Sequence, residues 1–297
     1  HWARYDGCFA VGNLVRWMLT HATSSTMPPM DHFDWSELNT LADPEAIAAH
    51  VGFETPVLSV WAEHDSDDAY WKAVDQSLMH ERIRVPGLHS GGWFDHLTIG
   101  QVEAYANIRD RGATEEARKG QRLLIGPWGH QTLGDTGPEH RRYGEWEFGP
   151  NADLPVLEHE LRFLDLHLQD RDEGYSSQPP VKVFLMGENR WVYLEDWPPP
   201  GIEERACYLT SDGGARMVAG DGELTWETPG RSGSDAYTYD PGNPAPTLGG
   251  PIYWGLEPRG PVDQRPLLGR HDVLYYRGPR LASPLTVMGE ISLDLFV

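Results

Sequence analysis

The sequence predicts a chain of mixed class, in which an α/β segment with a parallel sheet is followed by an all-β segment of sandwich or jelly-roll type. Between residues 81 and 178, strand candidates alternate with amphipathic helices, a pattern that gives parallel strands joined by right-handed crossovers. From residue 179 to 297, helical periodicity is absent, and short strands are separated by turns rich in Gly, Pro and Asp. Residues 1 to 80 are helical in pattern and rich in tryptophan.

The first region contains one helix with clear end signals. In "DPEAIAAHVG", Asp43 is placed to cap the N-terminus, Pro44 takes the first helical position and Gly52 ends the helix. Upstream, "FAVGNLVRWML" has apolar residues at helical spacing. We therefore expect residues 1–80 to form a helical unit.

The α/β region begins with two strand candidates, "RIRVPGLHSGGW" and "QRLLIG". The helix between them has Val102, Tyr105 and Ala106 at i, i+3 and i+4. A second helix follows "LPV", and its leucines repeat at helical spacing, which predicts a face turned toward the core: Leu157, Leu161, Leu164 and Leu168.

The last region, residues 179–297, is predicted to be a β-sandwich. Its strand candidates are "PPVKVFLMG", "RACYLTS", "DAYTYD", "HDVLYYRG" and "LTVMGEISLDLFV". The final stretch stops without a turn, and the chain starts at His1 rather than Met, so we expect an internal piece of a longer protein.

Composition excludes several classes of function. The 297 residues carry a formal charge of −21, which would repel a phosphate backbone, so no nucleic-acid partner is expected. Two cysteines, Cys8 and Cys207, cannot form a disulfide framework or a zinc site. No run of about 18 apolar residues is present, so no membrane span is expected.

Two polar residues follow the two strands of the α/β region, at the edge where open α/β sheets bind ligands. Asp95 ends "GGWFD" and His130 ends "GPWGH", 35 positions later and across one crossover helix. Asp and then His on consecutive strand ends is the chain order of the last two members of an α/β-hydrolase triad. An aspartate at a strand end is common and most of the 13 histidines are structural or exposed, so the prediction depends on the two residues together.

The chemistry of the pair follows from ordinary pKa values. An imidazole titrates near ~6.5, so a neutral His130 can take a proton from a serine hydroxyl at pH 7 and later return it. Asp95 would accept a hydrogen bond from the other ring nitrogen and stabilise the imidazolium. We expect Trp93 and Trp128 to wall this site.

The nucleophile of such a triad is not evident in this sequence. A serine elbow reads G-x-S-x-G and precedes the Asp and His in this fold. No serine before Asp95 has glycines at both flanking offsets, and Ser90 lies only five residues before Asp95. Ser232 in "GRSGS" lies downstream in the β region. We therefore expect the nucleophile to precede residue 1.

The chain resembles the cocaine esterase-like, or X-Pro dipeptidyl-peptidase-like, α/β hydrolases. The resemblance rests on segments that occur in one order: "DDAYW", "VPGLHSGGWFD", "LLIGPWGH", "PPVKVFLMGENRWVYLEDWP" and "GPVDQRP". It implies a helical cap over residues 1–80, the C-terminal part of the catalytic domain over 81–178, and a truncated jelly roll over 179–297. The family's triad aspartate falls on Asp95 and its histidine on His130, whereas its serine and oxyanion-hole tyrosine precede the cap.

The resemblance implies a serine hydrolase that cleaves esters or amides through an acyl-enzyme, with no metal or organic cofactor. Alternatives are an X-Pro dipeptidyl-peptidase or an acylase of the same family, and a non-catalytic binding or structural protein that keeps the fold. "DHLTIG" after Asp95 lacks the acidic cluster with which amino-acid ester hydrolases of the family bind a substrate ammonium. The expected partner is a small ester, amide or peptide substrate, and a homo-oligomer is left open. Three cap residues are candidate pocket linings: Trp17, Trp61 and Trp71.

Overall fold

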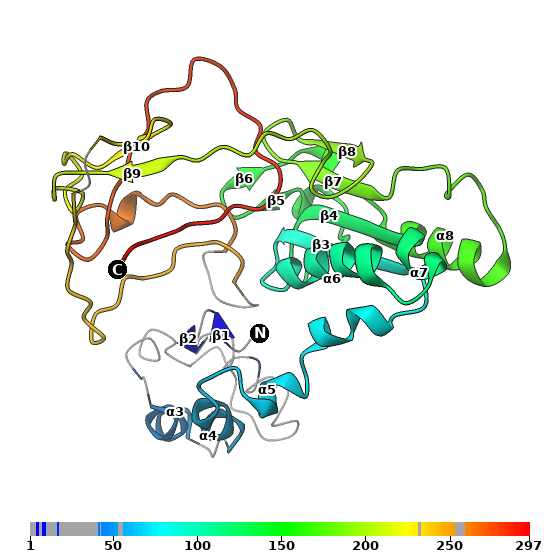
Figure 1. The fold of residues 1–297 in the computed structure, drawn as a ribbon, viewed down its shortest axis with the longest axis horizontal. Helices are drawn as coiled ribbons and strands as arrows, with labels where there is room; N and C mark the ends of the chain where they lie inside the picture. Colours follow the sequence, from blue (N-terminus) through cyan, green and yellow to red (C-terminus); the bar gives the residue numbers. More distant parts are fainter. Residues whose placement is uncertain are drawn as a thin grey trace.

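The computed structural model describes residues 4–5, 8–9, 17, 41, 43–52, 56–230, 233–252 and 259–297. Seen in Figure 1, the helices of the first 80 residues lie at the bottom, the main sheet lies at the upper right, and the β-rich C-terminal region lies at the upper left. The predicted class is confirmed as an α/β part with parallel strands, followed by a β-rich region.

The described part of the N-terminal region consists mainly of short helices. The predicted helix is present as α3, with Gly52 at φ 80° directly after it, a left-handed conformation that suits glycine. Of the segment "FAVGNLVRWML", only Phe9, which belongs to strand β2, and Trp17 are among the described residues, so the predicted helix lies otherwise outside them. The elements of this region are β1 (Arg4–Tyr5), β2 (Cys8–Phe9), α3 (Pro44–Val51), α4 (Pro56–Glu63), α5 (Ala69–Lys72) and the 3-10 helix η2 (Gln76–Arg82).

Four strands form the main sheet, in the order β3-β4-β7-β8. The predicted strand–helix–strand unit is confirmed. β3 and β4 are parallel, and α6, which lies between them in the sequence, packs against both strands. β7 is also parallel to β4, and β8 forms an antiparallel hairpin with β7. The elements are β3 (Gly87–Phe94), α6 (Thr98–Arg111), α7 (Glu115–Lys119), β4 (Gln121–Gly129), α8 (Val156–Gln169), β7 (Val181–Leu185) and β8 (Arg190–Leu194).

The placement of β7 differs from the sequence prediction, which assigned residues 181–185 to the antiparallel sandwich. Val181 to Val183 instead pair in parallel with Leu123 to Ile125 in the middle of β4. A short run of apolar residues fits a buried parallel strand as well as a sandwich strand, so the pattern alone could not place it.

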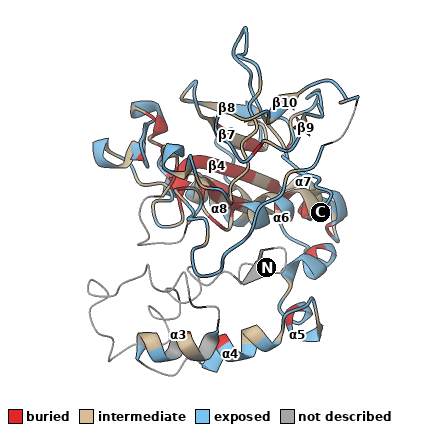
Figure 2. Ribbon diagram, turned by 90° about the vertical axis from the view of Figure 1, so that its left-hand side faces the viewer, coloured by how far each residue is buried: buried red, intermediate tan, exposed pale blue. Residues whose placement is uncertain are grey.

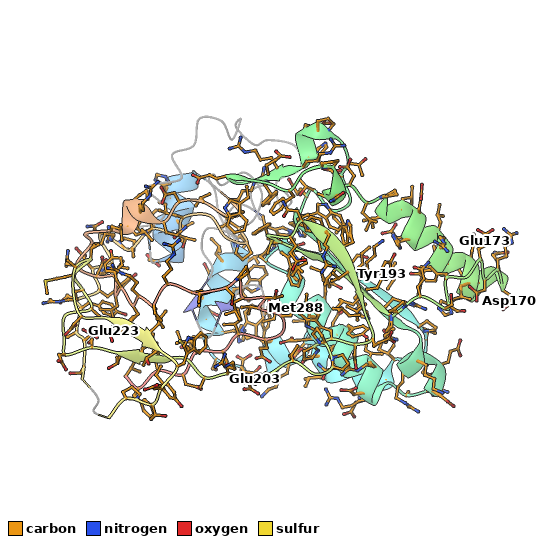
Figure 3. The ribbon with its side chains drawn as sticks, turned by 90° about the horizontal axis from the view of Figure 1, so that it is seen from above. Asp170, Glu173, Tyr193, Glu203, Glu223 and Met288 are labelled. Carbon is orange, nitrogen blue, oxygen red and sulfur yellow. The ribbon has the colours of Figure 1, made fainter. Side chains whose placement is uncertain are left out.

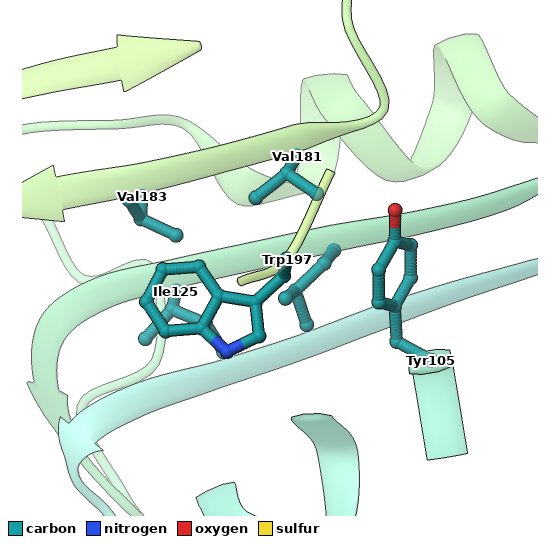
Figure 4. Close-up of a cluster of buried hydrophobic side chains, with 6 residues drawn as sticks. Tyr105, Ile125, Val181, Val183 and Trp197 are labelled. Atoms are coloured by element: carbon teal, nitrogen blue, oxygen red, sulfur yellow. The ribbon is translucent and has the colours of Figure 1, made fainter. Parts of the chain in front are cut away.

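Apolar side chains cover both faces of β4, which Figure 2 shows as mostly buried. On one face, Leu123 and Ile125 pack with Val181 and Val183 under the α6 residue Tyr105; Figure 4 shows Trp197 lying across this cluster. On the opposite face, Leu124 packs with another set of buried residues: Trp128, Leu154 and Val156. The alternation along β4 therefore fixes a core on each side of the sheet.

The leucine face of α8 is not turned toward the core, and that prediction is wrong. Leu157, Leu161, Leu164 and Leu168 are 45–71 % exposed. The buried residues of the helix are Val156 and Phe163, which lie on a different side. Helical spacing identifies residues that share a face, but it does not say which face meets the sheet.

Beyond β8 the chain is β-rich but has few regular strands among the described residues. β9 (Tyr208–Thr210) and β10 (Glu223–Thr225) pair antiparallel, and η5 (Arg265–Leu267) is a 3-10 turn. The strands expected in "DAYTYD", "HDVLYYRG" and "LTVMGEISLDLFV" are not formed in the described structure. At the chain end the alternating residues Ile291, Leu293 and Leu295 are exposed, because no neighbouring strand in the described residues pairs with them.

The β-rich region and the sheet meet near the middle of the molecule. Met288 packs against the buried cluster that contains Tyr105 and Trp197, and Figure 3 labels it between Glu223 in the β-rich region and Asp170 at the end of α8.

Connecting segments between β4 and α8 complete the structure: η3 (Pro138–His140), β5 (Arg142–Tyr143), β6 (Trp146–Glu147) and η4 (Pro150–Ala152). In the portions that the structure describes, no helix combines the length and apolar character needed to span a bilayer.

Candidate active site

The candidate site lies at the carboxyl ends of β3 and β4, where a bulge brings two positions level. Gly92 pairs with Gly126, but Phe94 pairs with Gly129, so β4 contains one residue more than β3 over this interval. The residues that follow the last pair are Asp95 and His130. The extra residue therefore sets the 35-residue offset that places these two side by side.

Asp95 is held in a tight turn between β3 and α6. Its amide donates to the carbonyl of Gly92 at 2.9 Å, and the Leu97 amide donates to its Oδ1 at 2.8 Å. The hydroxyl of Thr98 also donates to the Gly92 carbonyl, which joins the first residue of α6 to the end of β3. This local hydrogen bonding fixes the direction of the carboxylate.

His130 is presented by a turn that requires glycine at the preceding position. The Gly129 amide donates to Thr132 Oγ1 at 3.1 Å, and the Thr132 amide donates back to the Gly129 carbonyl at 3.3 Å. A Cβ atom on Gly129 would overlap the hydroxyl of Tyr143, whose ring stacks on Phe94 at 5.2 Å. The Gly-His sequence is thus explained by the close approach of Tyr143.

Asp95 and His130 form the hydrogen-bonded pair that the sequence indicated. His130 Nδ1 lies 3.1 Å from Asp95 Oδ2 and 3.2 Å from Oδ1. The His130 side chain is 34 % exposed and that of Asp95 is 12 % exposed, so the imidazole is accessible while its carboxylate is enclosed.

The two pKa shifts agree on a charged carboxylate beside a basic imidazole. The hydrogen bond from Asp95 raises the pKa of His130 above its ordinary value, against the opposing effect of partial burial. Burial by itself would raise the pKa of Asp95, but the hydrogen bonds from His130 and the Leu97 amide outweigh it and hold that pKa below its ordinary value. The arrangement can therefore accept a proton on the imidazole and stabilise the resulting cation.

A second imidazole at this site was missed in the sequence. His96 is buried, its Nδ1 lies 3.4 Å from Asp95 Oδ1, and its ring centroid is 4.9 Å from that of His130. Burial lowers the pKa of His96, with the Asp95 carboxylate opposing the shift. The dipeptide Asp95-His96 was visible at the strand end, but one histidine among 13 gave no reason to select it.

The tryptophans predicted to line the site have packing partners of their own. Trp128 is 2 % exposed and packs into the core on one face of β4. Trp93 donates from Nε1 to the Phe184 carbonyl at 2.7 Å and lies 5.8 Å from Trp197. Trp128 is a core residue, whereas Trp93 is partly buried against the core, and the role of both in walling the site stays a prediction.

Three of the five tryptophans in the first 80 residues lie together. Trp61 stacks on Trp17 at 6.4 Å and lies 6.0 Å from Trp71, which is buried. These contacts describe an aromatic cluster in the helical region. Their role in a substrate pocket stays a prediction.

Comparison with known proteins gives the family. Residues 1–132 match the X-Pro dipeptidyl-peptidase (S15 family) model, and residues 173–297 match the X-Pro dipeptidyl-peptidase C-terminal non-catalytic domain. The whole chain is similar to cocaine esterase of Rhodococcus sp. (strain MB1 Bresler), at 30 % identity over 315 residues. The chain belongs to the cocaine esterase-like and X-Pro dipeptidyl-peptidase-like family of α/β hydrolases.

The chain spans about half the length of this curated relative, covering 52 % of it. Among solved structures, an aminopeptidase from the marine sediment archaeon Thaumarchaeota archaeon has a similar fold, with a TM-score of 0.62 and 24 % sequence identity. The match covers 90 % of this chain and 44 % of that one. The fold is therefore shared over most of the present chain and less than half of the solved protein.

Proposed function

We propose that this chain supplies the acid–base half of a serine hydrolase that cleaves ester or amide bonds through an acyl-enzyme. The observation that carries the proposal is the hydrogen bond between His130 Nδ1 and Asp95, 3.1 Å long and at the carboxyl ends of two parallel strands. Family membership supports the same class of chemistry, and a relative carries the name cocaine esterase.

In the proposed mechanism, a serine from polypeptide outside this sequence attacks the substrate carbonyl. His130 takes the hydroxyl proton on Nε2, because its Nδ1 is engaged with Asp95. The proton then passes from Nε2 to the leaving alkoxide or amine, and the acyl-serine remains. Water enters, His130 removes its proton in turn, and the acid is released with serine restored.

Asp95 acts in this mechanism as a positioning residue. Its carboxylate keeps the Nδ1 proton in place and stabilises the imidazolium that forms in each half-reaction. The low pKa of Asp95 supports this role, because the carboxylate stays ionised at neutral pH.

The substrate class includes esters and amides, since the two matching family models are named for X-Pro dipeptidyl-peptidase and the curated relative for an esterase. Activity of the whole gene product toward a phenyl ester and toward an Xaa-Pro anilide separates the esterase from the peptidase.

A fluorophosphonate probe tests the proposal on the whole gene product and on the present 297-residue chain. The whole product is expected to be labelled at one serine outside this sequence, and labelling should weaken strongly in His130→Gln. The 297-residue chain is expected to stay unlabelled. Labelling of a serine within these 297 residues would overturn the assignment of the nucleophile, and an unlabelled, inactive whole product would favour a non-catalytic protein that retains the fold.

A further inference from the structure

Two imidazoles flank one carboxylate oxygen at the end of β3. Asp95 Oδ1 lies 3.2 Å from His130 Nδ1 and 3.4 Å from His96 Nδ1. The His96 side chain is 4 % exposed, and the two rings lie 4.9 Å apart with an angle of 56° between their planes. The proposed hydrolase mechanism uses Asp95 and His130 but gives His96 no part.

These separations are close to those around a tetrahedral metal ion. Zinc binds imidazole nitrogen and carboxylate oxygen at about 2.0–2.2 Å, so its ligand atoms stand roughly 3.3–3.6 Å from one another. One ligand atom from each of Asp95, His96 and His130 lies within 4.8 Å of the other two. Binding one ion would draw the ligand atoms closer than this 4.8 Å limit.

We propose that Asp95, His96 and His130 form a binding site for Zn²⁺, with water at the fourth position. Two nitrogen donors and one oxygen donor favour zinc and its transition-metal neighbours over Mg²⁺ or Ca²⁺, which prefer oxygen. Throughout the described ranges of the chain, no other set of three His, Cys or carboxylate side chains converges as closely.

Zn²⁺ and the Asp95 carboxylate compete for the same atom, His130 Nδ1. To ligate the ion as a neutral imidazole, His130 must offer the Nδ1 lone pair, so its proton moves through solvent from Nδ1 to Nε2, the nitrogen that would otherwise accept the serine proton. The imidazole is then held on the metal and cannot serve as a general base. Zn²⁺ would thus be a reversible inhibitor; this consequence rests on the proposed function, whereas binding of the ion does not.

The test is direct metal binding to the 297-residue chain, freed of metal by a chelator and then dialysed. Calorimetric titration with Zn²⁺ is expected to show one saturable site, and Co²⁺ in its place should give the intense visible bands of a four-coordinate ion. A chain with no saturable site, or with only the weak spectrum of six-coordinate Co²⁺, would overturn the proposal.

A matched pair of variants places the ion. His96→Gln is expected to weaken Zn²⁺ binding by at least about 100-fold, since loss of a supporting hydrogen bond alone costs about 10- to 100-fold. His140→Gln is the control, because His140 also lies 3.5 Å from two carboxylates, Asp135 and Glu139, but outside the proposed site. Equal affinity in both variants, whether retained or lost, would contradict the assignment.

Because His96 is buried, circular dichroism checks the folded state of each variant, and Asp95→Asn gives a second ligand deletion of unchanged size. If both deletions unfold the chain, the Co²⁺ spectrum of the unmodified chain decides the question. In the whole gene product, ester turnover is then measured with Zn²⁺ and with chelator. The ratio of the two rates is determined for each variant and for the unmodified protein. Binding without inhibition would count against the proposed hydrolase and leave the metal site in place.

Discussion

Phe94 pairs with Gly129 across β3 and β4, one position out of step with the Gly92–Gly126 pair before it. This shift brings Asp95 and His130 to the same level at the sheet edge. A Cβ atom on Gly92 would overlap the Trp128 carbonyl, so the bulge also depends on the close approach of the two backbones. The candidate site is therefore determined by strand register as well as by the identity of its side chains.

Gly129→Ala is expected to destabilise the chain and disturb the presentation of His130. The new methyl group would overlap the Tyr143 hydroxyl, and overpacking of this kind costs about 1–3 kcal/mol. Gly100→Ala is the matched control, because no atom lies within 4 Å of its new Cβ and alanine favours the α6 helix. Chemical denaturation measures both free energies of unfolding, and a Gly129→Ala chain as stable as Gly100→Ala would contradict the account.

Trp197→Ala is expected to lower the free energy of unfolding by about 3–5 kcal/mol, the usual cost of truncating a buried aromatic residue. Trp197 is 7 % exposed and packs with Val181, Val183 and Tyr105 at the junction of the sheet and the β-rich region. Trp226→Ala removes the same number of atoms at a residue that is 40 % exposed, so its effect should be much smaller. Similar losses in the two variants would show that the cluster is not a core of the molecule.

Much of the sheet and the site pair could be predicted because both depend on local sequence. The strand candidates "RIRVPGLHSGGW" and "QRLLIG" correspond to β3 and β4, and the helix between them required parallel strands, which placed Asp95 beside His130. The leucine face of α8 and the partner of β7 were predicted wrongly, because each depends on which neighbour covers a surface. Periodicity carries no information about that neighbour.

His96 and the β-bulge were missed for a related reason. The bulge is a property of two strands together, so it cannot be read from "GPWGH" alone. His96 becomes informative only when its ring is seen beside both Asp95 and His130. Strands expected near the chain end, in residues 285–297, depend on pairing partners that the described residues do not provide.

The lowered pKa of His159 predicts that the chain loses stability at acid pH. Burial, followed by the charges of Lys182 and Arg162, lowers the pKa of His159 to about 4 from the ordinary 6.5. Between these values the unfolded chain binds a proton that the folded chain does not, so this residue makes stability fall as pH drops from about 6.5 to about 4. Above this range His159 is neutral in both states and contributes no pH dependence.

The check on His159 is the difference in free energy of unfolding between the unmodified chain and His159→Gln, measured from pH 7 to pH 4. As pH falls, the His159→Gln chain should become more stable relative to the unmodified chain. In a chain that keeps His159, Lys182→Met should make the free energy of unfolding depend less steeply on pH, because Lys182 Nζ lies 3.1 Å from His159 Nε2. A difference that stays constant with pH would mean that His159 is protonated normally in the folded chain.

The most direct test of the central claim is the turnover of a simple phenyl ester by the whole gene product carrying Asp95→Asn. This change keeps the size of the side chain but removes the charge beside His130, which lies 3.1 Å away. We expect kcat to fall by up to ~10⁴-fold with little change in KM, while circular dichroism shows an intact fold. Turnover close to that of the unmodified protein would contradict the role assigned to the Asp95–His130 pair.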